Sequence, residues 1–436
     1  MVPHLATTLQ GPINELEQRV LEAMPVIERW FRLEWMEHTP PFYGAVDVRN
    51  AGFKLAPVGN DLFPGGWNHL SEEVLPLAVQ AATAAIEKIC PEAKNLLIVP
   101  SNQAEDAALH DTGYLLNLLQ LKRVFQLAGL NVRFGSVSPH LSEQTTVSLP
   151  DGQSITLEPV VRSARRLGLK HFDPCTILLN QPLATGVPGI LEELHEQNLL
   201  PPLHAADACR LNGRFLSTYD DIAKRFGKLI GIDPWLINPL HELVPVCDLS
   251  SAHDVAVLAE KVEALLHKIR RKYKDYGIQE QAWVDLKCNS RSSRCGVLRL
   301  SQGADLGPLL RQMSAGHVDQ FDKAEGLVLQ EAVLTHEHVE DRMAQPVVYL
   351  MDRYVVGGFY KVQADTLTAS AWQSETSTYL PLAFERGRHL PNPDHKPGAS
   401  GPNRFYMYGV VARLAMLAVS YELEVTDPNA EVEGVA

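Results

Sequence analysis

The sequence predicts an α/β protein with a parallel sheet in its first part and more strands in its second part. Between residues 72 and 180, segments with helical periodicity alternate with short apolar runs, an order typical of a parallel sheet covered by helices. After residue 280, short apolar segments of strand length dominate. The chain has 436 residues, which is enough for two or three domains with cores of their own.

The expected elements of the first part begin with an amphipathic helix within the first forty residues, where Ile13, Leu16 and Val20 share one helical face. Residues 46–68 are rich in Gly, Pro and hydrogen-bonding side chains, so a shaped loop is expected there. Residues 145–161 alternate around Asp151-Gly152, which predicts a β-hairpin. Helices and buried strands are otherwise expected in alternation over 72–90, 96–99, 114–127, 131–135 and 176–180.

Further helices are expected over 223–230 and 254–276, the latter ended by Gly277. Strands are then expected over 282–287, 297–300, 326–333, 347–351 and 359–362. A last helix over 403–424 would precede a frayed tail. We therefore divide the chain into residues 1–250, residues 251–425 and the tail 426–436.

Composition excludes several classes of protein. With 39 Lys and Arg against 52 Asp and Glu, the net charge is −13, whereas proteins that bind nucleic acid need a basic surface. No secretory signal precedes the first helix, and the apolar run 410–419 is too short to cross a membrane. The six cysteines contain no Cys-x-x-Cys pair and are expected to be reduced thiols in a cytoplasmic protein.

The polar segment 287–296 lies between two expected strands, with Lys287 at the end of the first. Exposed backbone N–H groups and Lys or Arg side chains in such a loop can converge on phosphates. The alternative is a solvated hairpin, since the segment contains one glycine and no Walker motif.

Two other segments offer metal ligands. Asp352 follows the expected strand 347–351, where it is either a Mg²⁺ ligand or one half of a surface ion pair. His336 and His338 flank Glu337 and could bind a metal, although an exposed charged turn has the same composition. Cys288 and Cys295 have no histidine near them in sequence, which disfavours a nucleophilic role.

Several longer stretches carry a family resemblance that covers most of the chain. They are TPPFY at 39–43, VRNAGFKLAPV at 48–58, LFPGG at 62–66, LIGIDPWLINP at 229–239, QE at 330–331 and MDRYVVGGFY at 351–360. Together they resemble the proteobacterial glutamate-cysteine ligases of the Thiobacillus ferrooxidans type, which are ATP-grasp-like enzymes. The resemblance implies an N-terminal α/β domain on the amino acid side, followed by a mixed α+β nucleotide-binding domain.

The activity implied by this family is the ATP-dependent joining of the glutamate side-chain carboxylate to the amine of cysteine. The chemistry requires a phosphorylated carboxylate, held by Mg²⁺ and cations while the amine attacks. ATP and Mg²⁺ are therefore the expected cofactors. Glutamate and cysteine, or another amine, are the expected partners, and the oligomeric state is left open.

The resemblance also assigns individual residues. Lys287 is expected to reach the ATP phosphates, and Asp352 to hold Mg²⁺. The adenine and ribose are expected to lie against Gln330, Glu331 and Val333. The amino acid substrate is expected to bind Arg49, Asn50, Lys54 and Asn68. Arg353, and Lys361 where the family has an arginine, complete the expected catalytic set.

The chain departs from the family in its phosphate loop, which in the family reads K-A-D-x-G-T-Y-G-M-G. Here Arg291 and Arg294 replace the first two glycines, so the arginines either change the shape of the loop or donate directly to phosphate as catalytic groups. An Asn-rich stretch near the metal site is also replaced, at residues 367–373. Two functions therefore stay open: an active ligase, or an impaired paralogue that binds an amino acid or regulates.

Overall fold

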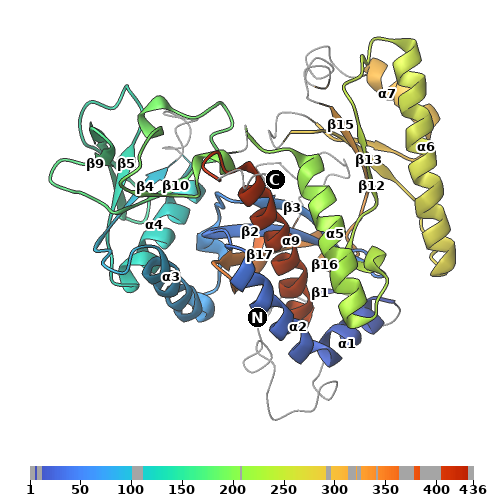
Figure 1. The fold of residues 1–436 in the computed structure, drawn as a ribbon, viewed down its shortest axis with the longest axis horizontal. Helices are drawn as coiled ribbons and strands as arrows, with labels where there is room; N and C mark the ends of the chain where they lie inside the picture. Colours follow the sequence, from blue (N-terminus) through green and yellow to red (C-terminus); the bar gives the residue numbers. More distant parts are fainter. Residues whose placement is uncertain are drawn as a thin grey trace, which may run out of the picture.

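The computed structural model describes residues 5–6, 12–100, 111–206, 209–290, 296–312, 321, 326–339, 342–362, 378–382 and 404–430. Three sheets lie side by side (Figure 1): a six-stranded sheet, a seven-stranded sheet at the centre and a four-stranded sheet on the far side. The mixed α/β fold expected from the sequence is confirmed. Short 3-10 turns connect several elements: η1 (Trp67–His69), η2 (Glu72–Val74), η3 (Gly189–Leu191), η4 (Leu203–Ala205), η6 (Pro234–Ile237) and η7 (Gly303–Asp305).

The six-stranded sheet contains the predicted alternation of helices and strands. Its order is β11 (Asn198–Leu200), β10 (Thr176–Asn180), β4 (Asn95–Pro100), β5 (Asn131–Ser136), β7 (Ser154–Pro159) and β6 (Thr145–Ser148). All neighbours are parallel except β6 and β7, which form the predicted hairpin. Helices α3 (Leu75–Ile89) and α4 (Thr112–Leu127) pack together beside this sheet, and β8 (Val161–Ser163) with β9 (Arg166–Gly168) forms a separate two-stranded sheet.

The central sheet is antiparallel and combines strands from both ends of the chain. It contains β1 (Leu5–Ala6), β2 (Tyr43–Asn50), β3 (Leu55–Asp61), β16 (His338–Val339), β17 (Arg342–Met351), β18 (Tyr354–Val362) and β19 (Thr378–Pro381). Strand β17 pairs with β2 and with β18. These strands come from both sides of the predicted boundary at residues 250–251, and that boundary stays a prediction.

The prediction of a shaped loop over 46–68 is wrong for most of this segment, which contains most of β2 and all of β3. Val46 and Val48 are fully buried, whereas Asp47 and Arg49, which alternate with them, are partly exposed. This period of two is the pattern of a strand with one apolar and one polar face. The partner that orders β2 is β17, almost 300 residues away in the chain, so local composition did not reveal it.

Helices cover the apolar face of the central sheet. The opening segment forms two helices rather than one, α1 (Pro12–Glu22) and α2 (Met24–Glu37), and α5 (Asn212–Ile230) is longer than expected. The last helix, α9 (Arg404–Thr426), packs against α5, β2 and β3 (Figure 1). Among the described residues, no helix is both long and apolar enough to cross a membrane.

The four-stranded sheet has the order β12 (His241–Val244), β15 (Leu327–Glu331), β13 (Val284–Cys288) and β14 (Leu298–Leu300). Helix α6 (Ala252–Asp275) contacts β12, β13 and β15, and α7 (Leu306–Gln312) packs against α6. Val284, Leu286 and Leu329 are fully buried and form the apolar face of this sheet under α6. Its opposite face is polar.

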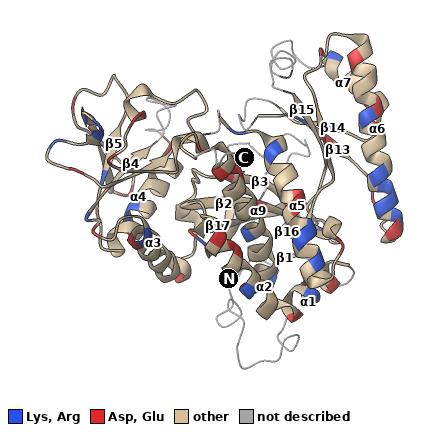
Figure 2. Ribbon diagram, in the orientation of Figure 1, with Lys and Arg blue, Asp and Glu red and all other residues tan. Residues whose placement is uncertain are grey.

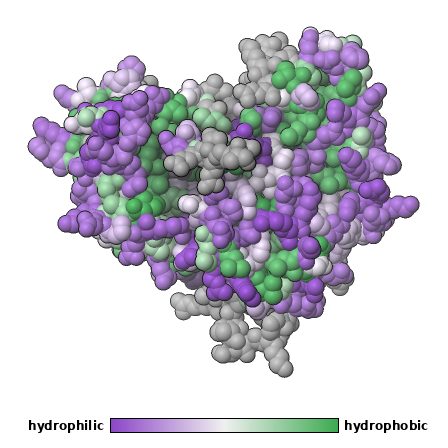
Figure 3. Space-filling model, viewed as in Figure 1, coloured by the Kyte–Doolittle hydropathy of each residue, from purple (hydrophilic) through white to green (hydrophobic). Residues whose placement is uncertain are grey.

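Charged side chains of both signs lie along the outer helices, and Lys and Arg gather towards one end of α6 (Figure 2). In the space-filling view, hydrophilic side chains cover most of the visible face and apolar ones form separate patches (Figure 3). Cys90, Cys175, Cys209 and Cys247 are free thiols, but Cys288 is disulfide-bonded. The expectation of reduced thiols is therefore wrong at Cys288.

Candidate active site

Polar side chains gather on the face of the four-stranded sheet that is turned away from α6. Asp285 and Gln330 are directly opposite each other in the β13–β15 ladder, so they share this face. Arg299 on β14 donates to Asp285 from Nε at 2.7 Å and from Nη2 at 3.0 Å. Lys287, two residues after Asp285, donates from Nζ to Gln330 Oε1 at 3.0 Å. This face therefore carries two cations and one carboxylate.

The central sheet has a polar face of its own, formed where β2, β17 and β18 lie side by side. Gln345 on β17 donates to Asp47 Oδ1 at 2.9 Å and accepts from Arg49 Nε at 2.9 Å. Lys361 on β18 is directly opposite Gln345. Among the described residues, Lys361 has no ion-pair partner.

Arg49 joins the two polar faces. Its Nη1 donates to the carbonyl of Val333, just beyond β15, at 3.1 Å. Burial lowers the pKa of Arg49 to about 10, with the neighbouring carboxylates of Asp285 and Asp47 opposing this shift and Arg299 adding to it. Charged residues of both sheets thus lie close enough to Arg49 to shift its pKa, and its guanidinium remains charged near neutral pH. Lys287, Arg299 and Arg49 together form a junction suited to binding a polyanion.

Comparisons with known proteins identify the family. A family model described as glutamate-cysteine ligase matches residues 17–423. The chain belongs to the glutamate-cysteine ligase family. A solved structure from Methylobacillus flagellatus KT, described as a candidate gamma-glutamylcysteine synthetase, is 43% identical with a TM-score of 0.87, over 98% of this chain and 100% of that chain.

A second solved structure, D-alanyl-alanine synthetase A from Vibrio cholerae, is 11% identical with a TM-score of 0.34, over 74% of this chain and 81% of that chain. No curated protein matches the sequence. Membership of the glutamate-cysteine ligase family thus rests on the family match and on the Methylobacillus structure.

In this member of the glutamate-cysteine ligase family, Lys54 and Glu331 form a buried ion pair of 2.6 Å. Both oxygens of Glu331 also lie within 3.2 Å of Trp235 Nε1, and Oε2 accepts from the backbone N–H of Leu240 at 2.9 Å. Burial lowers the pKa of Lys54 to about 8. The structure therefore brings together one predicted substrate residue and one predicted nucleotide residue, with their charged groups directed at each other.

Asn50 lies on the opposite face of β2 from Arg49. Its Nδ2 donates to Glu337 Oε1 at 3.0 Å, and its Oδ1 accepts from the N–H of Gly52 at 2.9 Å. Glu337 also accepts from the hydroxyl of Tyr408 on α9, and burial raises the pKa of Glu337 to about 7. Adjacent residues of a strand point to opposite faces, so predicted substrate residues 49 and 50 are separated by the sheet itself.

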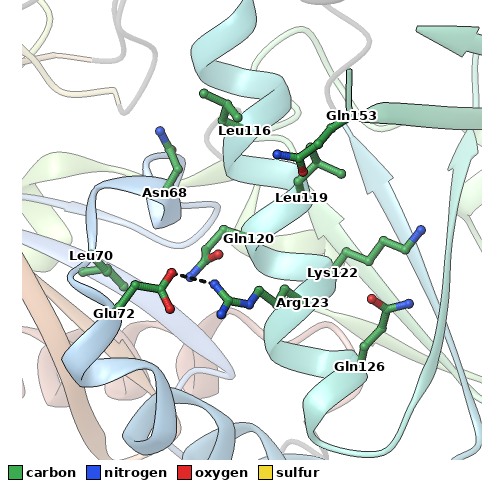
Figure 4. Close-up of a pocket in the computed structure, with 10 residues that line it drawn as sticks. All are labelled: Asn68, Leu70, Glu72, Leu116, Leu119, Gln120, Lys122, Arg123, Gln126 and Gln153. Atoms are coloured by element: carbon green, nitrogen blue, oxygen red, sulfur yellow. Dashed lines mark hydrogen bonds and ion pairs between the residues drawn. The ribbon is translucent and has the colours of Figure 1, made fainter. Parts of the chain in front are cut away.

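Asn68 lines a pocket of about 520 Å³ between η1, η2 and α4 (Figure 4). The pocket is largely polar, with Gln120, Gln126 and the ion pair of Arg123 with Glu72 at 2.6 Å along its wall. Asn68 Oδ1 is buried and accepts no hydrogen bond from any residue that the structure describes. The structure thus places Asn68 by a pocket of its own rather than beside Arg49.

Asp352 and Arg353 lie in the turn between β17 and β18. Asp352 pairs with Lys88 of α3 at 3.3 Å, and Arg353 Nη2 donates to the hydroxyl of Tyr354 at 3.1 Å. Gln345 is seven residues before Asp352, which is roughly 20 Å along a strand. The structure therefore does not bring Asp352 to Lys287. Arg291 and Arg294 lie outside the described residues.

Four polar residues in or beside the junction are not predicted from the sequence: Asp47, Asp285, Arg299 and Gln345. Asp47 and Asp285 carry a local signal, because V-D-V-R at 46–49 and V-D-L-K at 284–287 both alternate apolar and charged residues. Alternation of this kind indicates a strand with one functional face. Arg299 has the same signal in L-R-L at 298–300, whereas Gln345 has none, since its role follows from pairing between distant strands.

Proposed function

We propose that the protein is an ATP-grasp-like ligase that uses ATP to join the glutamate side-chain carboxylate to the amine of cysteine. The observation that carries this proposal is the junction of the two polar faces at Arg49, within a chain of the glutamate-cysteine ligase family. The nucleotide would lie between the four-stranded and central sheets. The protein would act in the cytoplasm on small molecules.

The reaction would run through an acyl phosphate. The glutamate carboxylate takes the γ-phosphoryl group of ATP, and the amine then attacks the carbonyl carbon and displaces phosphate. Lys287 would bind the phosphates and offset their charge, and Arg49 and Lys361 would add positive charge from the central sheet. Arg291 and Arg294 would add donors from the loop that follows β13.

The nucleotide base would border the end of β15. Gln330 would stay in contact with Lys287, to which it is already hydrogen-bonded. Val333 would contribute its apolar side chain, and Arg49 fixes its backbone by donating to its carbonyl. Because the Glu331 carboxylate is bound to Lys54, we assign Glu331 a role in fixing the strand against which adenine lies.

Mg²⁺ would supply charge neutralisation on the phosphates. Within the described residues, no three His, Cys, Asp or Glu side chains gather into a metal site, and Asp352 is paired with Lys88. The described carboxylates thus do not fit a metal centre, and Asp352 as its ligand stays a prediction. We assign no step of the reaction to the metal.

Mass spectrometry of products tests the proposal. The protein is incubated with MgATP, glutamate, cysteine and a pool of other amines, and γ-glutamylcysteine with ADP is the expected result. Lys287→Ala should lower the rate by about 10² or more, as expected when a charge-assisted contact to the transferred group is lost. Lys228→Ala, at an exposed lysine on α5, is the matched control.

A different γ-glutamyl amide would keep the ligase chemistry and change the acceptor. Absence of both amide and ADP would contradict the proposal and favour the impaired paralogue that binds an amino acid or regulates. Unchanged turnover in Lys287→Ala would remove the assignment of Lys287 while leaving the reaction in place.

A further inference from the structure

His69 lies in the LFPGGWNH segment, which the junction does not use. It ends η1, and its imidazole stacks on the ring of Tyr379 with centroids 3.9 Å apart and planes 16° apart. The edge of the same imidazole meets Phe359 at 5.5 Å. Two aromatic side chains of the central sheet therefore hold His69 in place.

Strand pairing connects His69 to the polar face of the central sheet. Tyr379 is directly opposite Lys361 in the β18–β19 ladder, so the two side chains share a face. Phe359, two residues before Lys361, lies on that face as well and contacts Tyr379 at 5.4 Å. Trp67 and Tyr349 continue the face as a covered aromatic surface. His69 thus lies where the covered part of the face gives way to the part that bears Lys361.

The imidazole of His69 is available for proton transfer. It makes no hydrogen bond or ion pair with any residue that the structure describes, and it is only partly exposed. Partial burial lowers the pKa of His69 below its usual value, so the imidazole is uncharged at neutral pH and one ring nitrogen carries no proton. A neutral imidazole with a free nitrogen can accept a proton.

Carboxylates act on the two tyrosines of this face. Burial raises the pKa of Tyr379, and the nearby carboxylates of Asp111 and Asp47 raise it further. Tyr349 is affected in the same way by burial and by Asp61 and Asp47. Asp111 caps α4, Asp61 ends β3 and Asp47 lies on β2. Together with the aromatic rings, these charges favour a cation such as a substrate ammonium group.

We propose that His69 is a catalytic residue that accepts a proton from the amine that attacks the acyl phosphate. This inference rests on the proposed function. The protonated amine gives one proton to the imidazole, its nitrogen forms the C–N bond with the γ-carbonyl carbon, and the C–O bond to phosphate breaks. The second proton lost by the nitrogen leaves on the phosphate, and the imidazolium then returns its proton to solvent.

Hydroxylamine separates this step from the formation of the acyl phosphate. Hydroxylamine is largely neutral near pH 7 and attacks acyl phosphates without help from a base, giving a γ-glutamyl hydroxamate. For His69→Gln we expect amide formation with cysteine to fall by about 10² or more, while hydroxamate formation changes less than about threefold. His69→Phe, which keeps an aromatic ring against Tyr379, should behave in the same way. His267→Gln, at an exposed position of α6, is the control and should leave both products unchanged.

The outcomes are distinct. Unchanged amide formation in both His69 variants overturns the proposal, and so does an equal loss of amide and hydroxamate, which would place His69 before the amine attacks. Wild-type protein that makes neither product overturns the proposed function, and the role of His69 falls with it. In wild-type protein the rate with cysteine should also decline at acidic pH as His69 is protonated, and His69→Gln should lack this decline.

Discussion

Lys54 and Glu331 form an ion pair of 2.6 Å from which water is almost completely excluded, with exposed side-chain fractions of 0% and 1%. Lys54 comes immediately before β3 of the central sheet, and Glu331 ends β15 of the four-stranded sheet. The ammonium of Lys54 also lies 4.1 Å from the ring centroid of Trp235. The pair therefore fixes one sheet against the other, and the spacing of the junction at Arg49 depends on it.

Removing one partner of this pair should be costly. In Lys54→Met, Glu331 would remain buried with only the Trp235 and Leu240 N–H donors, and breaking a buried pair typically costs about 3–5 kcal/mol. We expect the midpoint of urea unfolding to fall accordingly. Lys228→Met on the surface of α5 should change the free energy of unfolding by less than about 0.5 kcal/mol.

The double variant Lys54→Met with Glu331→Leu tests whether charge or packing matters at this position. It should recover part of the stability, because replacing both ions by apolar groups removes the uncompensated charge. A double variant no more stable than Lys54→Met would argue that the loss comes from packing.

Glu337 should make stability depend on pH. Its pKa is raised from 4.5 to about 7 in the folded protein, so the folded state holds an extra proton between these values. The stabilisation is therefore fully present below about pH 4.5 and is lost as the pH rises through about 7. Its full size is on the order of 3 kcal/mol.

Glu337→Gln should remove the part of the pH dependence that comes from this carboxyl. The measurement is the difference in unfolding free energy between about pH 5 and pH 8. The exposed Glu192→Gln should keep the wild-type profile. A Glu337→Gln variant with the same pH profile as wild type would show that this carboxyl is already ionised at pH 5.

Arg49→Lys should impair the reaction more than the fold. The guanidinium of Arg49 donates at the same time to Gln345 at 2.9 Å and to the Val333 carbonyl at 3.1 Å. The ammonium of a lysine lacks this planar set of donors and cannot keep both hydrogen bonds. We expect kcat/KM for ATP to fall at least about tenfold, with circular dichroism unchanged. The same change at the exposed Arg271 of α6 should have no effect. Equal kcat/KM in the two variants would mean that the junction does not bind nucleotide.

Gly358 leaves no room for a side chain between β17 and Leu382. A Cβ atom there would lie 2.5 Å from the Val347 carbonyl oxygen and 2.5 Å from Leu382 Cδ1. Gly358→Ala should therefore cost about 1–3 kcal/mol of stability and disturb the register that places Lys361. Gly189→Ala, where a Cβ meets nothing within 4 Å, should be nearly neutral in the same thermal unfolding measurement.

Local pattern predicted the elements that form between neighbours in sequence. The strand 176–180 and the hairpin around Asp151-Gly152 are predicted correctly, because the apolar run and the turn that indicate them each span only a few residues. The local sequence predicts a loop where β2 and β3 lie, because the order of these strands comes from β17 and from the buried α9. The sequence could show that Asp47 and Arg49 were polar, but only pairing with a distant strand shows that they share a face with Gln345.

In the site, too, the sequence indicates the polar residues but not their distant partners. Lys287 and Gln330 were predicted, and a hydrogen bond of 3.0 Å joins them across neighbouring strands. The family resemblance assigns Lys54 and Asn50 to the substrate, and that assignment stays a prediction; the sequence gives no sign that each has a buried partner. Glu331 and Glu337 are those partners, and they lie about 280 residues away.

The pairing of β2 with β17 also bears on how the protein is made. Residues 43–50 leave the ribosome long before residues 342–351, roughly 15–60 s earlier at about 5–20 residues per second. During that interval the edge of β2 that pairs with β17 has no partner, although β3 can already pair with the other edge. The apolar face of β2 also lacks α9, the last helix of the chain. Nascent chains of this protein should consequently depend on chaperones until translation ends, and fragments truncated before residue 342 should lack Gln345, which holds Arg49, and Lys361 opposite it.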